Sequence, residues 1–533
     1  MNGELRGKKR ESRRIFLVSF LIFGLAAGGA LVLYHATSNW GMGTNFDSAA
    51  YLAMARSLLQ GRGMDIPYAA GGAQAHYAPL YPVLISFLGS SGVPLLTAAR
   101  WLHLFFFALN IFLTGWILVK TTRSFWLPVL GSFFILTSAD MIHIHHAVFS
   151  EPLFLFCGFL GLFLMSEYSL NGRLFLLIFS SVALAMAFLS RYAGFAFILT
   201  ALVGLSFIQW RTERQRFQEV AFCFGITLLP MVLWCVRNYF IAGTWTNRLL
   251  RFHLISPEVI RQGLDTISRW CLPGNVPLAV RGGVMGIVSL GCLIYWITHR
   301  SKLPRDDFSG GGGQGLTCGH PFPLWLLVFI VTDVIFMTIC ISSVNESIPL
   351  NGRILSPVYM AFLFLALYAG HQFWMLSWGK VFSRIVLVCL CLWFVGFYAV
   401  RGAVTEVRLF QKGWGMTSRS WRKSPVIREV KRLPPGWIIY SNAPEAISIL
   451  TVMAARFIPS KMDPFNFAPN TRWEQEMKTM VHTLEQQEGV LVFCNKRIMR
   501  EWSMTQEELL EMKPVRRLKI WKSVRDGFVL KSG

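Results

Sequence analysis

Long apolar runs separated by short polar segments occupy most of the chain up to residue 400. A helix needs about 20 mostly apolar residues to cross a bilayer, and we identify about eleven candidate runs. They lie at 15–35, 95–119, 125–139, 150–167, 174–190, 193–209, 219–236, 282–298, 324–342, 354–370 and 384–400. We therefore predict an all-α polytopic membrane domain with about eleven transmembrane helices over residues 1–400.

The chain from 401 to 533 has a different pattern. Trp437–Asn442 and Gly489–Cys494 have the composition of short strands, while Glu474–Gln487 and Thr505–Met512 have helical spacing. This predicts a small soluble α/β domain at 401–533. Its 23 Lys and Arg outnumber 13 Asp and Glu, which suits either contact with anionic lipid headgroups or an ordinary solvated surface.

Composition narrows the class of protein. Hydrophobic residues make up 54% of the chain and charged residues 15%, against about 25% charged in soluble proteins. The formal charge of +23 comes from Lys and Arg in short segments between apolar runs, where basic residues set membrane orientation. We therefore expect membrane lipids, and not nucleic acid, as partners of the basic surface.

The distribution of basic residues also predicts orientation. The N-terminus is basic, and the run at 15–35 is long enough to be a retained helix instead of a cleaved signal. Alternate loops are basic, whereas Ala139–Ser150 carries no Lys or Arg. The basic loops are Lys120–Arg123, Asn171–Arg173, Arg211–Arg216, Arg300–Arg305 and Lys380–Arg384. The pattern predicts a multi-pass protein of the inner (plasma) membrane with a cytoplasmic N-terminus and an extracytoplasmic C-terminal domain.

The first outer loop carries the most informative acid. Asp47 precedes a helical pattern with Tyr51, Met54 and Leu58 three or four residues apart, and Gly61 is a plausible end. We expect an amphipathic helix on the membrane surface. At its start, Asp47 either caps the helix or faces a cavity as a base. A proline-bracketed turn follows at 76–82 (HYAPLYP).

The second outer loop, 139–152, holds Asp140, three histidines including His146, and Glu151. These residues suit either metal ligands or the polar rim of a cavity, and their spacing matches no fixed zinc motif. We assign no metal site, and a divalent metal stays an open alternative as cofactor. A carboxylate at a span end, such as Glu151, needs water, protein or a cation beside it.

Three arginines, Arg191, Arg237 and Arg353, fall on the same predicted face as Asp47. Each is either an anchor at the membrane interface or a ligand for a lipid phosphate, whose oxygens match a guanidinium fork.

Together these segments resemble the GT-C glycosyltransferases. The resemblance rests on Asp47 after the first run, the Tyr…Ala-Arg-x-Leu…Gly-x-Gly helix and the Pro-Leu-Tyr-Pro turn. Three further segments agree, namely Ser190–Gly194 (SRYAG), Trp234–Tyr239 (WCVRNY) and Asn351–Pro357 (NGRILSP). The layout matches over about residues 10–400, closest to the polyprenyl-phosphate-sugar-dependent group that includes protein O-mannosyltransferases and aminoarabinose transferases.

This resemblance implies a function and a site. The chain would move a sugar from a polyprenyl-phosphate donor to an extracytoplasmic lipid, polysaccharide or protein, with inversion. It implies three groups of residues: Asp47 and Glu151 as catalytic; Arg191, Arg237 and Arg353 on the donor phosphate; Tyr51, His76, Tyr81, Asp140, His146 and Tyr192 around the substrate cavity.

The chain departs from the family's sequence pattern at two positions, and two other functions remain as alternatives to glycosyl transfer. Many relatives have Asp-Glu where this chain has Asp47-Ser48, and Ala78 replaces a proline of the turn. The first departure puts a second carboxylate there in doubt. The rivals are a transporter or flippase of lipid-linked sugars, and a non-catalytic membrane protein whose outer domain binds a partner.

Overall fold

The computed structural model describes residues 2–68, 73–122, 124–208, 212–287, 320–343, 348–375, 380–451, 453–463, 468–495 and 504–532. All structural statements below concern these residues. The predicted run at 282–298 is described only to residue 287, and the predicted loop Arg300–Arg305 lies outside the described residues.

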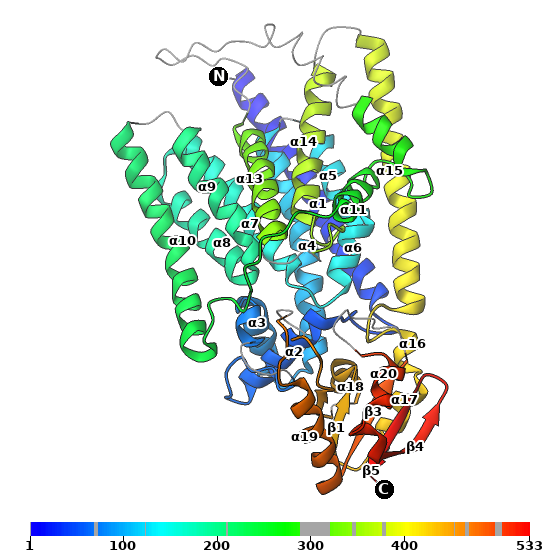
Figure 1. Ribbon diagram of the computed structural model, residues 1–533. Helices are drawn as coiled ribbons and strands as arrows, with labels where there is room; N and C mark the ends of the chain where they lie inside the picture. Colours follow the sequence, from blue (N-terminus) through cyan, green and yellow to red (C-terminus); the bar gives the residue numbers. More distant parts are fainter. Residues whose placement is uncertain are drawn as a thin grey trace.

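Helices occupy every predicted apolar run as far as it is described (Figure 1). They are α1 (Asn2–Ala36), α4 (Leu95–Thr121), α5 (Trp126–Thr137), α6 (Ala139–His146), α7 (Glu151–Asn171), α8 (Leu174–Ser190), α9 (Phe195–Phe207), α10 (Glu213–Ala242), α13 (Phe322–Ser343), α14 (Ser356–Met375) and α15 (Lys380–Lys412). Shorter elements are α2 (Phe46–Leu59), η1 (Ala73–His76), α3 (Leu80–Gly89), η2 (Tyr192–Gly194) and α11 (Pro257–Ser268).

The lengths of these helices refine the predicted count. Among the described residues, 7 helices are long and apolar enough to cross a membrane, or 8 if the bent pair α5–α6 is one span. Three further predicted runs form shorter apolar helices, at Leu174–Ser190, Tyr192–Phe207 and Leu278–Ile287. The prediction of a polytopic α-helical membrane domain is confirmed.

The segment after α5 differs from the prediction of a loop at 139–150. The chain bends by 56° at Ser138 and continues as α6. Ser138 has extended backbone angles, and its side chain accepts a hydrogen bond from Met141 N, so it restarts the helix as an N-cap. The prediction was wrong here because a polar residue that interrupts one helix can also begin the next.

Close helix contacts in the bundle depend on small residues. A side chain at Gly161 of α7 would come within 2.5 Å of Leu184 Cδ2 on α8, and one at Gly158 within 2.4 Å of Phe197 on α9. Ser180 Oγ of α8 also donates a 2.7 Å hydrogen bond to the carbonyl oxygen of Gly161. Since lipid gives little hydrophobic force between spans, such packing and hydrogen bonds hold them together.

The C-terminal domain is built on a five-stranded sheet with strand order β2-β1-β3-β5-β4. Its strands are β1 (Ile438–Ser441), β2 (Ala455–Phe457), β3 (Gly489–Cys494), β4 (Leu518–Val524) and β5 (Gly527–Ser532). β1 pairs in parallel with β2 and β3, whereas β5 is antiparallel to β3 and β4. The helices around it are α16 (Arg419–Arg422), α17 (Pro425–Val430), α18 (Pro444–Thr451), α19 (Trp473–Gln486) and α20 (Gln506–Glu511).

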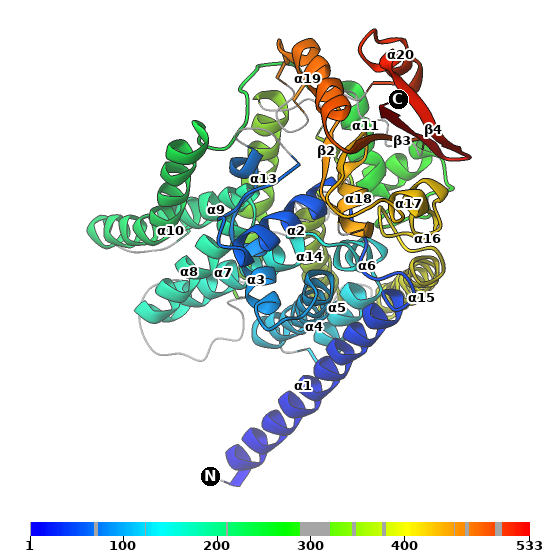
Figure 2. The same ribbon diagram turned by 90° about the horizontal axis from the view of Figure 1, so that it is seen from below.

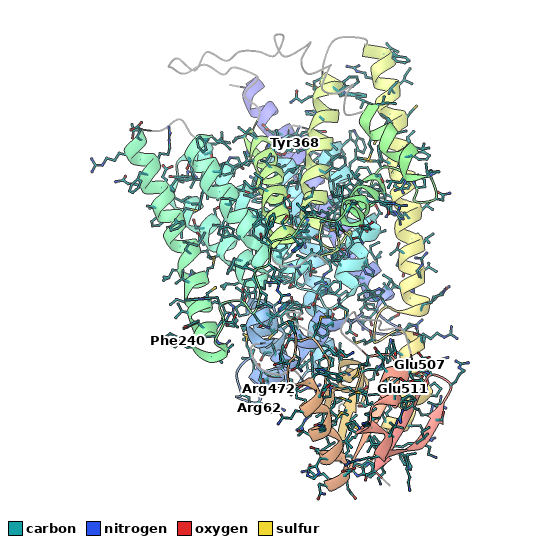
Figure 3. All side chains as sticks on the ribbon, viewed as in Figure 1. Arg62, Phe240, Tyr368, Arg472, Glu507 and Glu511 are labelled. Atoms are coloured by element: carbon teal, nitrogen blue, oxygen red, sulfur yellow. The ribbon has the colours of Figure 1, made fainter. Side chains whose placement is uncertain are left out.

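The α/β fold of the C-terminal segment is therefore confirmed, with all four predicted elements present. Helix α15 continues to Lys412, beyond the expected boundary at residue 401. The domain lies at one end of the bundle, here called the domain end, together with α2 and α3 (Figure 1). Seen from that end, α18 lies against α2 (Figure 2). The labelled charged side chains Arg62, Arg472, Glu507 and Glu511 are all at this end, whereas Tyr368 is toward the opposite one (Figure 3).

Candidate active site

The loop before α2 is fixed on both sides by backbone hydrogen bonds. On one side, Gly43 N donates to His146 O at 3.0 Å, and Val148 N donates to Gly43 O at 2.9 Å. On the other, Met416 N donates to Thr44 O at 2.8 Å. The loop thus joins α6 to the start of the C-terminal domain, and it determines where α2 and Asp47 begin.

Asn45, and not Asp47, caps α2. The Asn45 side chain accepts the backbone N–H of Ser48 at 3.0 Å. Asp47 is therefore released from capping, and its carboxylate lines a cavity. Most of α2 is buried, between α3 and α18, so the expectation of an amphipathic helix on the membrane surface is wrong. The C-terminal domain covers the face that we expected to meet lipid and water.

Glu151 is the first residue of α7 and is held by a buried polar network. Asn110 of α4 donates to Pro152 O at 3.0 Å and to His145 Nε2 at 3.2 Å. His103 Nδ1 donates to His145 O at 2.8 Å, so its Nε2 is free to accept the Tyr81 hydroxyl at 2.6 Å. These bonds fix the junction of α6 and α7, and with it the direction of the Glu151 side chain.

Arg353 lies in a turn whose shape is determined by the two residues before it, Asn351 and Gly352. The Asn351 side chain accepts the backbone N–H groups of Arg353 and Ile354 at 3.0 and 3.1 Å. A side chain at Gly352 would approach the Asp140 carboxyl group to 2.6 Å, so the Asp140 side chain would have to move. The Arg353 guanidinium lies over the Phe149 ring, 4.0 Å from its centroid. The turn thus directs Arg353 inward, and Asp140 packs behind it.

Two arginines and two carboxylates form one cluster. Arg353 Nη1 lies 2.6 Å from Asp47 Oδ2, and Arg353 Nε contacts Glu151 Oε1. Arg191 Nη1 lies 2.6 Å from the same Glu151 oxygen. Tyr77 donates its hydroxyl to Asp47 Oδ1 at 3.2 Å, and Tyr51 bonds Ser150 at 3.0 Å. One guanidinium thus bridges the two acids that the sequence singled out.

Burial and neighbouring charges shift the pKa values of two members of the cluster and of His76. Burial alone would raise the pKa of Asp47, but the guanidinium groups of Arg353 and Arg191 outweigh it and bring that pKa below its usual value. Burial would lower the pKa of Arg353, yet Glu151 and Asp47 raise it overall. Burial, with a contribution from Arg248, lowers the pKa of His76 to about 3, so this ring is neutral at physiological pH.

These groups line one cavity of about 470 Å³. Of the predicted site residues, those on its wall are Asp47, Tyr51, His76, Glu151, Arg191, Tyr192 and Arg353. Four are not on its wall. Tyr81 is buried behind Tyr51, with ring centroids 5.0 Å apart. Asp140 packs on Gly352, His146 is buried beside Gly43, and Arg237 stacks on Trp234 at 4.8 Å.

The cavity contains two charged residues that the sequence analysis did not select. Arg248 follows α10 and has no ion pair with any described residue; no motif marks it. Asp333 lies in the middle of α13, only 5% exposed, and no described residue gives it a hydrogen bond or ion pair. A lone acid inside a highly apolar span is itself a signal of function, which could have identified Asp333.

The histidines of the predicted second loop are used in packing. The ring nitrogens of His145 contact Met141 O at 2.7 Å and Asn110 at 3.2 Å, and the His143 ring packs on Trp414. Within the described ranges, no group of three or more His, Cys, Asp or Glu is placed to hold a metal ion.

Comparisons with known proteins agree with this architecture. The family model "Dolichyl-phosphate-mannose-protein mannosyltransferase" matches residues 68–242. A comparison with curated protein sequences gave no match.

Three solved structures resemble the chain over most of its length. ArnT from Cupriavidus metallidurans bound to undecaprenyl phosphate is 13% identical, with a TM-score of 0.56 and coverage of 95% of this chain and 97% of that one. The oligosaccharyltransferase AglB from Archaeoglobus fulgidus, in complex with an inhibitory peptide and a dolichol-phosphate, is 11% identical, with a TM-score of 0.52 and coverage of 89% and 69%. The arabinofuranosyltransferase AftD from Mycobacteria is 13% identical, with a TM-score of 0.53 and coverage of 96% and 40%.

All of these proteins are GT-C glycosyltransferases. The chain therefore shares the fold of these three structures over 89% to 96% of its length, which agrees with the expected GT-C fold.

Proposed function

We propose that this protein transfers a sugar from a polyprenyl-phosphate donor to a hydroxyl or amine of a lipid, polysaccharide or protein. The observation that carries the proposal is the bridge of Asp47 and Glu151 by Arg353 on the wall of a 470 Å³ cavity. The similar fold of ArnT, whose structure contains undecaprenyl phosphate, supports a lipid phosphate as donor.

Asp47 is the general base in this proposal. Its lowered pKa keeps it ionised at neutral pH, and its carboxylate can accept a proton from the acceptor. The acceptor oxygen or nitrogen then forms a bond to the anomeric carbon of the sugar. The bond from that carbon to the phosphate oxygen breaks, and polyprenyl phosphate leaves with the electron pair. Attack opposite the leaving group inverts the anomeric centre.

The arginines explain how the base becomes active. In the structure Arg353 forms ion pairs with the carboxylates of Asp47 and Glu151. A donor phosphate would compete for this guanidinium, which weakens the pair with Asp47 and raises the pKa of Asp47 toward that of a better base. Arg248 has no carboxylate partner among the described residues and is available to the phosphate directly. Charge that develops on the leaving phosphate is stabilised by these groups.

Glu151 serves chiefly as a positioning residue in this scheme. It is 1% exposed and contacts both Arg191 and Arg353. Replacing it by Gln would leave two largely buried guanidinium groups without their shared partner, which costs more than the loss of one ordinary hydrogen bond.

We further propose an orientation in the inner membrane, with a cytoplasmic N-terminus and the domain end outside. The basic loops between the spans support this assignment through the positive-inside rule.

The test is a transfer assay in membranes that contain the full-length protein and polyprenyl-phosphate sugars. We expect Asp47→Asn to lower the transfer rate by roughly 10²–10⁴-fold, the usual contribution of a general base. Asp65→Asn is the matched control, since Asp65 lies in the same loop region and does not line the cavity. Wild-type activity in folded Asp47→Asn would refute the base, and no sugar transfer from any lipid donor would refute the function.

A further inference from the structure

A second hollow lies between the end of α15 and the C-terminal domain, apart from the cavity of Asp47. It has a volume of about 650 Å³. Its wall is formed by the last residue of α15, by the loops around α16 and by the turn between β4 and β5. We call it the basic hollow, because four of its lining residues are cationic: Lys412, Arg419, Lys423 and Arg525.

None of these four cations has an acidic partner among the described residues. All are exposed, and none forms an ion pair or a side-chain hydrogen bond with a described residue. The one acid of the hollow, Asp526, is already engaged, because it accepts the Ser424 hydroxyl at 2.6 Å and the backbone N–H of Val426 at 3.1 Å. Four positive charges around one hollow repel one another unless an anion from outside lies between them.

The position of the hollow relative to the candidate spans favours a lipid headgroup as the anion. Lys412 ends α15, a candidate membrane span. The turns just before it expose Val400, Val404 and Val407 by 66%, 52% and 44%, and Arg408 is exposed beside them. The end of α1 lies at the same level, since His35 stacks on Phe410 with ring centroids 4.2 Å apart. The basic hollow therefore opens beside the ends of two candidate spans, where lipid headgroups would lie.

We propose that the basic hollow binds the phosphate headgroup of an anionic phospholipid in the leaflet at the domain end. The acyl chains of this lipid would lie along the exposed apolar face of α15. Each Lys or Arg near an anionic membrane surface favours such contact, and guanidinium groups match phosphate oxygens in bidentate fashion. The proposal does not rest on the transfer reaction.

A bound headgroup would reach the cavity of Asp47 through two aromatic rings. Trp414 forms part of the wall of the hollow, and its ring packs on Phe149 with centroids 5.6 Å apart. The other partner of Phe149 is the guanidinium of Arg353, at 4.0 Å. The lipid would thus hold in place the support under Arg353 as well as the base of the C-terminal domain.

The experiment measures lipid binding by the full-length protein in nanodiscs and by native mass spectrometry. The probes are phosphatidylglycerol, phosphatidylcholine and inorganic phosphate. The variant combines Arg419→Gln, Lys423→Gln and Arg525→Gln. Its matched control removes the same charge from exposed lysines outside the hollow, as Lys478→Gln, Lys513→Gln and Lys519→Gln.

We expect the wild type and the control to retain phosphatidylglycerol in preference to phosphatidylcholine. The hollow variant should bind phosphatidylglycerol about 100-fold more weakly, from three lost cations near the surface. An equal loss of phosphatidylglycerol binding in both triple variants would overturn the proposal, because removal of positive charge anywhere on the domain would then explain the weaker binding. Binding of inorganic phosphate as tight as that of phosphatidylglycerol would overturn it in favour of a soluble anion. If the triple variant fails to fold, Lys423→Glu alone carries the same comparison.

Discussion

At the scale of single residues, His76 illustrates how the cavity decides a protonation state. The pKa of His76 is about 3 in the folded protein, which keeps the ring neutral. As the pH falls below 6.5, the ordinary pKa of histidine, the ring takes up a proton in the unfolded chain but not yet in the folded protein. Stability contributed by neutral His76 is therefore lost as the pH drops from that value toward about 3. We expect pH–rate profiles of transfer to show no His76 ionisation between about pH 5 and 8. An inflection in that range that disappears in His76→Asn would contradict this assignment.

Asp333 leads to a second prediction at this scale. A buried carboxyl group without a partner lowers stability, and an apolar side chain of similar size removes that cost. We expect Asp333→Leu to raise the free energy of unfolding of the ligand-free protein by on the order of 1 kcal/mol. Thermal unfolding in detergent measures the change, with the exposed Glu507→Leu as control. A loss of stability would indicate that the carboxyl group has a partner in the protein.

The sequence predicted part of the cavity for a physical reason. Asp47, Glu151, Arg191 and Arg353 each lie at or beside a helix terminus, where the local motif fixes the direction of the side chain. Arg237 was expected at the end of a span that we placed at residue 236. Helix α10 instead continues to Ala242, with Cys235 on the cavity wall. Arg237 comes two positions after Cys235. Because a helix has 3.6 residues per turn, its side chain projects about 200° around the helix axis from that of Cys235.

At the scale of elements, the junction between the bundle and the domain depends on Gly415. This residue has φ of 65°, and a side chain there would come within 1.8 Å of Thr44 O. We expect Gly415→Ala to displace the loop before α2, and so to lower transfer by about tenfold or more, as small misplacements at a site do. Gly61→Ala is the matched control, because Gly61 has φ of 70° but open space around it.

Activity and thermal unfolding of both variants separate the two causes. The control should show only the cost of a left-handed residue, on the order of 1 kcal/mol, with activity intact. Equal activity loss in Gly415→Ala and Gly61→Ala would contradict a specific role for this contact.

The elements themselves were well predicted where periodicity is strong. Long apolar runs and the strands at 438–441 and 489–494 were found from pattern alone. The helix after Ser138 was missed because its polar cap was interpreted as the start of a loop. The covering of α2 by α18 was missed because it depends on contacts between segments far apart in the chain. The edge strand β4, with mostly exposed side chains, has no buried face for the pattern to reveal.

At the scale of the whole molecule, the C-terminal domain lies at the same end of the bundle as α2 and α3 (Figure 1). Residues of α2 line the cavity, and residues at the start of the domain line the basic hollow. Helix α7 starts at Glu151 in the cavity and, as a candidate span, ends on the other side, where Asn171–Arg173 is exposed. We expect an impermeant thiol reagent to label Arg62→Cys and Glu507→Cys in intact cells. Arg173→Cys should be labelled only after permeabilisation. Exposed Cys389 is replaced by Ser in all variants.

The three positions distinguish the fold from the orientation. If Arg62→Cys and Glu507→Cys react from opposite sides, the domain does not sit at the end that carries Asp47, and the contact between α2 and α18 fails with it. If both react only after permeabilisation, the fold stands but the orientation is reversed. The cavity of Asp47 would then face the cytoplasm, and an extracytoplasmic acceptor could not reach it, so that part of the proposed function would fall while the arrangement of the cluster remained.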